Sequence, residues 1–197
     1  HPLRFLPFPG TISPFEEMDL SLNFIHKENK YVDFNNERLL TQMHSNEGPA
    51  FTTEDLNNDG INDLFFGGAK NQSGKLFLSH GTTYKEIESP FQADAPSEDT
   101  DALFFDADND GDLDISLTGF DIYFDPRFIL YENLGDGTVA PYFTIMEGIA
   151  VSAVDWGDYD NDGDLDILLS GYSDSGIISR IYLNNSIVVN TLPLKPN

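Results

Sequence analysis

An acidic stretch of eight residues, DNDGDLDI, occurs twice without change, from Asp108 to Ile115 and again from Asp160 to Ile167. Carboxylates this close repel one another, and a run of acids by itself favours a solvated face. Each copy, however, continues into alternating apolar residues, DISLTGF or DILLSGY, which is the pattern of a half-buried strand. The acids are therefore expected in a loop fixed against a sheet, where converging carboxylates need a counterion.

The spacing of the acids predicts that this counterion is calcium. Counted from the first Asp of each loop, side chains with oxygen stand at positions 1, 3, 5 and 9, glycine at position 6 permits a sharp turn, and position 7 can offer its carbonyl. A third copy, DLNNDGIND, lies upstream. The expected ligands are Asp55, Asn57, Asp59, Ile61 and Asp63; Asp106, Asp108, Asp110, Asp112 and Asp114; and Asp158, Asp160, Asp162, Asp164 and Asp166. An all-oxygen set of this kind favours Ca²⁺ over Mg²⁺, with three ions expected, one for each loop.

The ends of the loops exclude an EF-hand. Position 12, where an EF-hand has Glu, is Phe66, Leu117 or Leu169. Each loop is therefore expected to join two strands rather than to lead into a helix. The alternative is an acidic β-turn of the Asx type without an ion, which three copies in register make a poor explanation. Asn57 replaces an acid in the first loop, so that site should bind more weakly.

The loops recur at intervals of 51 and 52 residues, which indicates a repeat architecture. Strand patterns before and after each loop predict an all-β fold of propeller-type blades, each with four antiparallel strands. The fourth strands are expected around Tyr84–Ile87, Tyr142–Ile145 and Ile187–Val189. Three blades do not close a ring, so an open arc or part of a larger or oligomeric assembly is expected.

The expected organisation has six parts. They are a Pro/Phe-rich arm at 1–19, N-terminal strands at 20–47 with a helical turn at Glu37–Met43, blades at 48–98, 99–149 and 150–190, and a tail at 191–197.

The loop with its following strand resembles the FG-GAP or VCBS repeat of integrin-α-type β-propellers. The segments LNFIHKENKYVDFNNERLL, DLNNDGINDLFFGGAKNQSGKLFL and EDTDALFFDADNDGDLDI, within residues 20–137, are most similar to the ASPIC/UnbV-type propellers of cartilage acidic protein. The resemblance implies a calcium-binding propeller, with the ligands at the positions already given. The ASPIC domain that follows in such proteins has no counterpart before Asn197.

Charge and composition exclude several classes of partner. The net charge is −24, and three Ca²⁺ would leave the chain acidic, which argues against nucleic acid or an anionic membrane as partner. The absence of cysteine excludes disulfides and zinc–thiolate sites. Calcium loops, a first residue that is His rather than Met, and acceptor patterns for N-glycans at Asn71 and Asn184 lead us to expect a secreted, extracellular protein.

No pattern of catalytic residues stands out, so no enzymatic activity is expected. The four histidines lack zinc-ligand spacing, and there is no GxSxG nucleophile motif. The predicted function is a calcium-binding extracellular module in adhesion or in a surface fibre, self-associating by strand or blade packing into a homo-oligomer or filament. A protein or glycan ligand is also possible in this interpretation. The alternative is the propeller scaffold of a larger secreted or surface enzyme or carbohydrate-binding protein.

Overall fold

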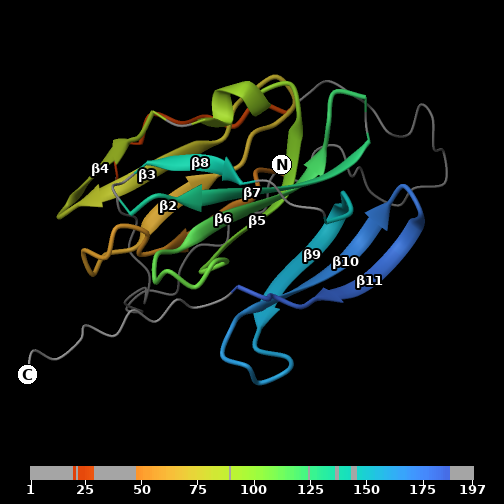
Figure 1. The fold of residues 1–197 in the computed structure, drawn as a ribbon. Coiled ribbons are helices and arrows are strands. Elements are labelled where there is room, and N and C mark those ends of the chain that lie inside the picture. Colours follow the sequence, from red (N-terminus) through yellow and green to blue (C-terminus); the bar gives the residue numbers. More distant parts are fainter. Residues whose placement is uncertain are drawn as a thin grey trace, which may run out of the picture.

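The protein is an all-β structure built from antiparallel sheets, as its sequence predicts. The computed structural model describes residues 20, 22–28, 48–88, 90–123, 125–135, 138–142 and 146–186. The first sheet, blade 1, has the order β1-β2-β3-β4, and the second, blade 2, has the order β5-β6-β7-β8. In the third, blade 3, the order of the described strands is β11-β10-β9. Each acidic loop joins the first strand of its blade to the second, as expected (Figure 1).

The strands follow the period of the repeat. Blade 1 contains β1 (Phe51–Glu54), β2 (Asp63–Phe66), β3 (Lys75–His80) and β4 (Thr83–Glu86). Blade 2 contains β5 (Glu98–Phe105), β6 (Asp114–Phe120), β7 (Pro126–Asn133) and β8 (Val139–Tyr142). Blade 3 contains β9 (Ala150–Gly157), β10 (Asp166–Ser173) and β11 (Gly176–Tyr182). β5 lies beside both β1 and β9, so equivalent first strands follow one another along the array.

The expected fourth strands have three different outcomes. β4 confirms the first to within one residue. β8 begins at Val139, earlier than expected, because Val139 is buried in the core and pairs with Asn133. Residues 143–145, and the whole of the strand expected at 187–189, lie outside the described residues.

The segment expected to form N-terminal strands has no strand among residues 22–28. Its backbone is instead bonded by a side chain, since the amide of Gln72 accepts from the N–H of Lys27 at 2.9 Å and donates to the carbonyl of Ile25 at 2.8 Å. One glutamine thus takes the place that a neighbouring strand would have. Phe24 also stacks on Phe66 of blade 1, with ring centroids 5.0 Å apart. The helical turn expected at 37–43, the arm at 1–19 and the tail at 191–197 lie outside the described residues.

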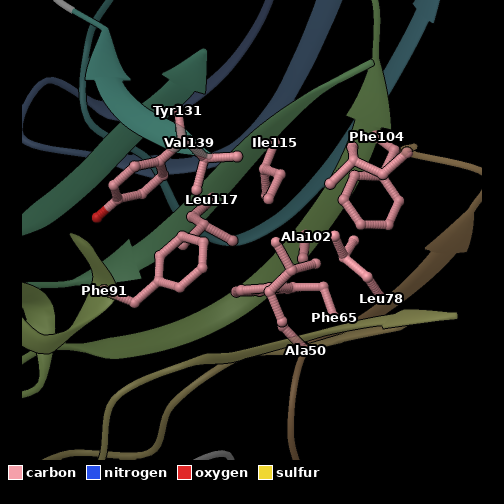
Figure 2. Packing of buried hydrophobic residues seen from close by; sticks show 12 residues of the cluster. Ala50, Phe65, Leu78, Phe91, Ala102, Phe104, Ile115, Leu117, Tyr131 and Val139 are labelled. Atoms are coloured by element: carbon pink, nitrogen blue, oxygen red, sulfur yellow. The ribbon is translucent and has the colours of Figure 1, made fainter. Parts of the chain in front are cut away.

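Two apolar cores lie between successive blades. The first joins Phe65 and Leu78 of blade 1 to Ile115 and Tyr131 of blade 2 (Figure 2). Phe91, in the short 3₁₀ helix η2 (Pro90–Asp94), packs edge-on against both Phe65 and Tyr131. The second core is made by blades 2 and 3 and consists of Phe105, Phe128, Leu130, Ile149, Ile167 and Leu169. Blade faces therefore supply most of the hydrophobic burial in this fold.

No helix in the described part of the chain is long and apolar enough to cross a bilayer.

Candidate metal centres

Acidic loops 1, 2 and 3, which are residues 55–62, 106–113 and 158–165, connect the first two strands of their blades. The Asp at position 9 of each pattern is the first residue of the following strand, as Asp63, Asp114 and Asp166 begin β2, β6 and β10. These three side chains are buried, so they are held by the sheet while the rest of each loop projects from it. The loops lie along one side of the molecule (Figure 1).

Two residues of each loop adopt left-handed backbone conformations. The glycines at position 6 have φ values of 86°, 97° and 102°, which confirms the expected turn, because L residues rarely adopt this geometry. The sequence analysis did not single out the asparagines at position 4, Asn58, Asn109 and Asn161, whose φ values are 58°, 66° and 61°. Asparagine is among the few non-glycine residues that enter this region readily.

The carboxylates at positions 1 and 9 fix the loop backbone. In loop 2, Asp106 accepts hydrogen bonds from the N–H groups of Asn109 at 2.7 Å and Gly111 at 3.0 Å. Asp114 accepts from the N–H groups of Ala107 and Asn133, both at 2.8 Å. Equivalent bonds to positions 1 and 9 recur in loops 1 and 3. The loops thus keep one shape through their own acids.

Three carboxylates converge in loop 2 and three in loop 3. Oxygens of Asp106, Asp108 and Asp114 all lie within 4.8 Å of one another, and so do those of Asp158, Asp160 and Asp166. These are positions 1, 3 and 9 of the predicted ligand pattern. In the described part of loop 1 no such group of three acids forms, because position 3 is Asn57.

Burial, with the charges of neighbouring acids, raises the pKa values of Asp108, Asp114 and Asp160. Burial raises the pKa of Asp114 to about 7, with further repulsion from Asp108 and Asp106. Desolvation also raises the pKa of Asp108, aided by the neighbouring charge of Asp110. In loop 3, desolvation and then the charges of Asp162 and Asp166 raise the pKa of Asp160. Groups that resist ionisation for these reasons are stabilised as carboxylates when a cation enters.

The acids at position 5 are not in either group of three. Asp110 and Asp162 accept hydrogen bonds from the N–H of the residue at position 7, at 2.9 and 3.0 Å. In loop 1, Asp59 makes the same bond to Ile61 and accepts a second from the hydroxyl of Ser79, which lowers the pKa of Asp59. Each of these carboxylates has a second oxygen or lone pair that a cation could use.

An asparagine missed by the sequence analysis joins each later blade to the preceding loop. Asn133, at the end of β7, receives a bond on its side-chain oxygen from Gly135 and donates through its amide to the carbonyl of Leu56 in loop 1, at 3.1 Å. Asn184, just after β11, donates in the same way to Ala107 in loop 2, at 2.9 Å. We call these two residues the clamp asparagines. A glycan on Asn184 would replace one of the two hydrogens of this side-chain amide.

The loops also contact one another directly. The side-chain amide of Asn58 donates to Asp112 of loop 2 at 3.2 Å, and that of Asn109 donates to Asp164 of loop 3. The carboxylates at position 7, Asp112 and Asp164, therefore accept a hydrogen bond from the preceding loop. The sequence signal for this contact is an Asn at position 4 and an Asp at position 7 one repeat later.

The donor sets of loops 2 and 3 fit Ca²⁺. They consist only of carboxylate oxygens, and they are held on strand ends and a tight turn. Ca²⁺ accepts six to eight oxygen ligands in flexible geometry, whereas Zn²⁺ prefers nitrogen and sulfur.

Residues 55–116 match the family model of the FG-GAP-like repeat. The matched segment begins at the first Asp of loop 1 and ends within β6, so it contains loops 1 and 2 together with β2 to β5. The match supports the FG-GAP and VCBS type of repeat for this segment, and the greater similarity to ASPIC/UnbV-type proteins stays a prediction. A search of curated proteins gives no significant match.

Proposed function

We propose that the protein is a non-enzymatic, calcium-stabilised extracellular repeat module that acts in adhesion or as a structural subunit through packing of its blades. The observation that carries this proposal is the same group of three carboxylates at loop 2 and at loop 3. The group at loop 2 lies within the segment that matches the FG-GAP-like repeat. Three acids within 4.8 Å of one another repel, a bound cation would relieve that repulsion, and one such group follows the first strand of both blade 2 and blade 3.

Calcium in these loops would act on stability rather than on catalysis. Asp114 is at once a member of the converging group and the acceptor of the Asn133 N–H in β7. An ion bound there would fix the loop and, through the strand ends, the blade. Binding to the native state alone stabilises it by about 2.7 kcal/mol for each site when free calcium is 100 times the dissociation constant.

Thermal unfolding with calcium and with EGTA tests the proposal. We expect the midpoint to fall on chelation and to return when calcium is added back, with a smaller recovery in magnesium. Asp108→Asn should show a reduced response, whereas Asp125→Asn, an exposed acid outside the loops, should respond as the unaltered chain does. A midpoint that EGTA leaves unchanged would remove the basis of the proposal.

The proposed role in assembly has its own measurement. Self-association into an oligomer or filament would appear as a concentration-dependent sedimentation coefficient or as fibres in electron micrographs. A monodisperse monomer over the whole concentration range would limit the module to packing with a different partner.

A further inference from the structure

The face of blade 3 that points away from blade 2, here called its outward face, is much more exposed than the equivalent face of blade 1. Register places Leu168 opposite Ile181, as it places Phe65 opposite Leu76 in blade 1. Phe65 and Leu76 are fully buried by blade 2, and Leu78 is 8% exposed. The equivalent residues of blade 3, Leu168, Ile181 and Leu183, are 44%, 43% and 48% exposed. With Tyr159 they line a surface hollow.

Polar groups of loop 3 are open on the same side. Asn161 has the left-handed conformation of Asn58 and Asn109, which both reach an Asp in the next loop. Asn161 is exposed and makes no hydrogen bond to any other residue that the structure describes. The carbonyl of Tyr159 occupies the position that Leu56 and Ala107 use to receive the clamp asparagines. Blade 3 thus has the same donor and the same acceptor that blades 1 and 2 each use to bind the blade that follows them.

The other end of the array is closed. The face of blade 1 that looks away from blade 2 contains Leu64 and Phe77, which are only 9% and 3% exposed. Phe24 of the N-terminal segment packs on Phe66 of this face. Loop 1 also has Ile61 where later loops have an Asp acceptor, and β3 has Ser79 where later blades have a clamp asparagine. Blade 1 therefore lacks both polar partners that an inner blade offers.

We propose that the outward face of blade 3 is a docking surface for a further FG-GAP-type blade of the inner kind, one with Asp at loop position 7 and Asn after its third strand. The partner's Asp receives the amide of Asn161, its Asn donates to the carbonyl of Tyr159, and its apolar face covers Leu168 and Ile181. A second copy of this chain, docking through its covered blade 1, does not meet these requirements. The inference rests on the proposed role in blade packing and does not require the calcium proposal to hold.

Cysteine labelling tests this surface, because the chain contains no cysteine of its own. Ile181→Cys places a thiol on the docking surface, and Leu76→Cys places one at the equivalent buried position of blade 1. In the full chain with calcium we expect the thiol at position 181 to react with a maleimide at least about tenfold faster than the thiol at position 76. The rate at position 181 should not change between low and high protein concentration.

The occupant is tested by extending the full chain with one extra repeat. A copy of residues 146–186 appended after Asn197 should protect the thiol at position 181 about tenfold, to near the rate at position 76. A copy of residues 48–88, the blade 1 sequence, should give no protection. Changing the appended counterparts of Asp164 to Ile and Asn184 to Ser should restore fast labelling.

Each other outcome overturns the proposal in a distinct way. Slow labelling in the chain alone at all concentrations would mean that the chain covers its own face. Protection that grows with concentration would identify a second copy as the occupant. Equal protection by either appended repeat would show that the position-7 Asp and the clamp asparagine do not select the partner. Loss of the EGTA response with labelling as expected would affect the calcium proposal alone.

Discussion

The side-chain amide of Asn133 is bonded to the main-chain carbonyl of Leu56, so the third strand of blade 2 is fastened to the acidic loop of blade 1. Both groups are buried, and removing the donor leaves the carbonyl without this partner. We expect Asn133→Ala to lower the free energy of unfolding by about 1–3 kcal/mol. Chemical denaturation measures it, with the exposed Asn185→Ala as control. Equal midpoints for the two variants would deny the clamp any role in stability.

Loops 2 and 3 should bind calcium more tightly than loop 1, where Asn57 replaces an acid. Isothermal titration calorimetry should show two stronger sites and one weaker site. Asn57→Asp should strengthen the weak site by about tenfold, because an added carboxylate raises the affinity of an oxygen site for Ca²⁺. Asn62→Asp adds the same charge to the same loop at a position outside the ligand pattern, and is the matched control. A similar gain from both substitutions would indicate a general effect of charge instead of a ligand.

The sequence predicts the loops well, because their pattern is local. The order of Asp, Asn and Gly along nine residues determines both the turn and the residues that can converge, and the alternating residues that follow determine the strand. Contacts between repeats are harder to predict. Asn133 and Leu56 are 77 residues apart, and nothing in the residues around Asn133 marks it as the donor. The bond between Asn58 and Asp112 is visible in the sequence only when successive repeats are aligned.

Two further differences have the same cause. The segment 22–28 has the alternation of a strand, but Gln72, 45 residues later, pairs with its backbone in place of a strand. β8 begins before the apolar run that suggested it, because the blade interface selects Val139 for burial. In both cases a distant partner decides the outcome.

Phe91 lies in the core that blades 1 and 2 share. Its ring lies 5.0 Å from that of Phe65 and 4.7 Å from that of Tyr131, and its side chain is 1% exposed. We expect Phe91→Ala to destabilise the protein by about 3–5 kcal/mol, because a cavity is left between two blades. Tyr123→Ala, at a position that is 75% exposed, should change the midpoint of chemical unfolding little. A small effect at Phe91 would mean that the blades are not coupled through η2.

Gly119 in β6 and Gly157 in β9 should differ sharply in their tolerance of alanine. A Cβ at Gly119 would lie 1.9 Å from the carbonyl oxygen of Glu98, so Gly119→Ala must displace the neighbouring strand. We expect a loss of about 3 kcal/mol in the free energy of unfolding. At Gly157 a Cβ meets nothing within 4 Å, and the change should stay within about 0.5 kcal/mol. Equal losses would place β5 and β6 farther apart than they are here.

The buried carboxyl of Asp99 should make stability depend on pH. Desolvation raises its pKa to about 6, against the attraction of Arg127 and the bond from the Gly68 N–H. The native protein therefore takes up this proton more readily than the unfolded chain, and its stability gains as the pH falls from 7 towards 4. Asp99→Asn abolishes the titration. In EGTA, the unfolding free energy of the unaltered protein relative to this variant should rise as the pH is lowered, and a flat or opposite trend would refute the assignment.

The position-4 asparagine of a blade donates to the following loop, and the clamp asparagine of an inner blade donates to the preceding loop. The repeats are therefore not interchangeable along the chain. Gene duplication of an inner blade would produce a longer array with every junction satisfied. Duplication of blade 1 would place Ile61 and Ser79 at a junction where an inner blade has an Asp acceptor and a clamp asparagine. An array of this kind can therefore lengthen by copies of an inner blade, whereas a copy of blade 1 would leave a junction without these two bonds.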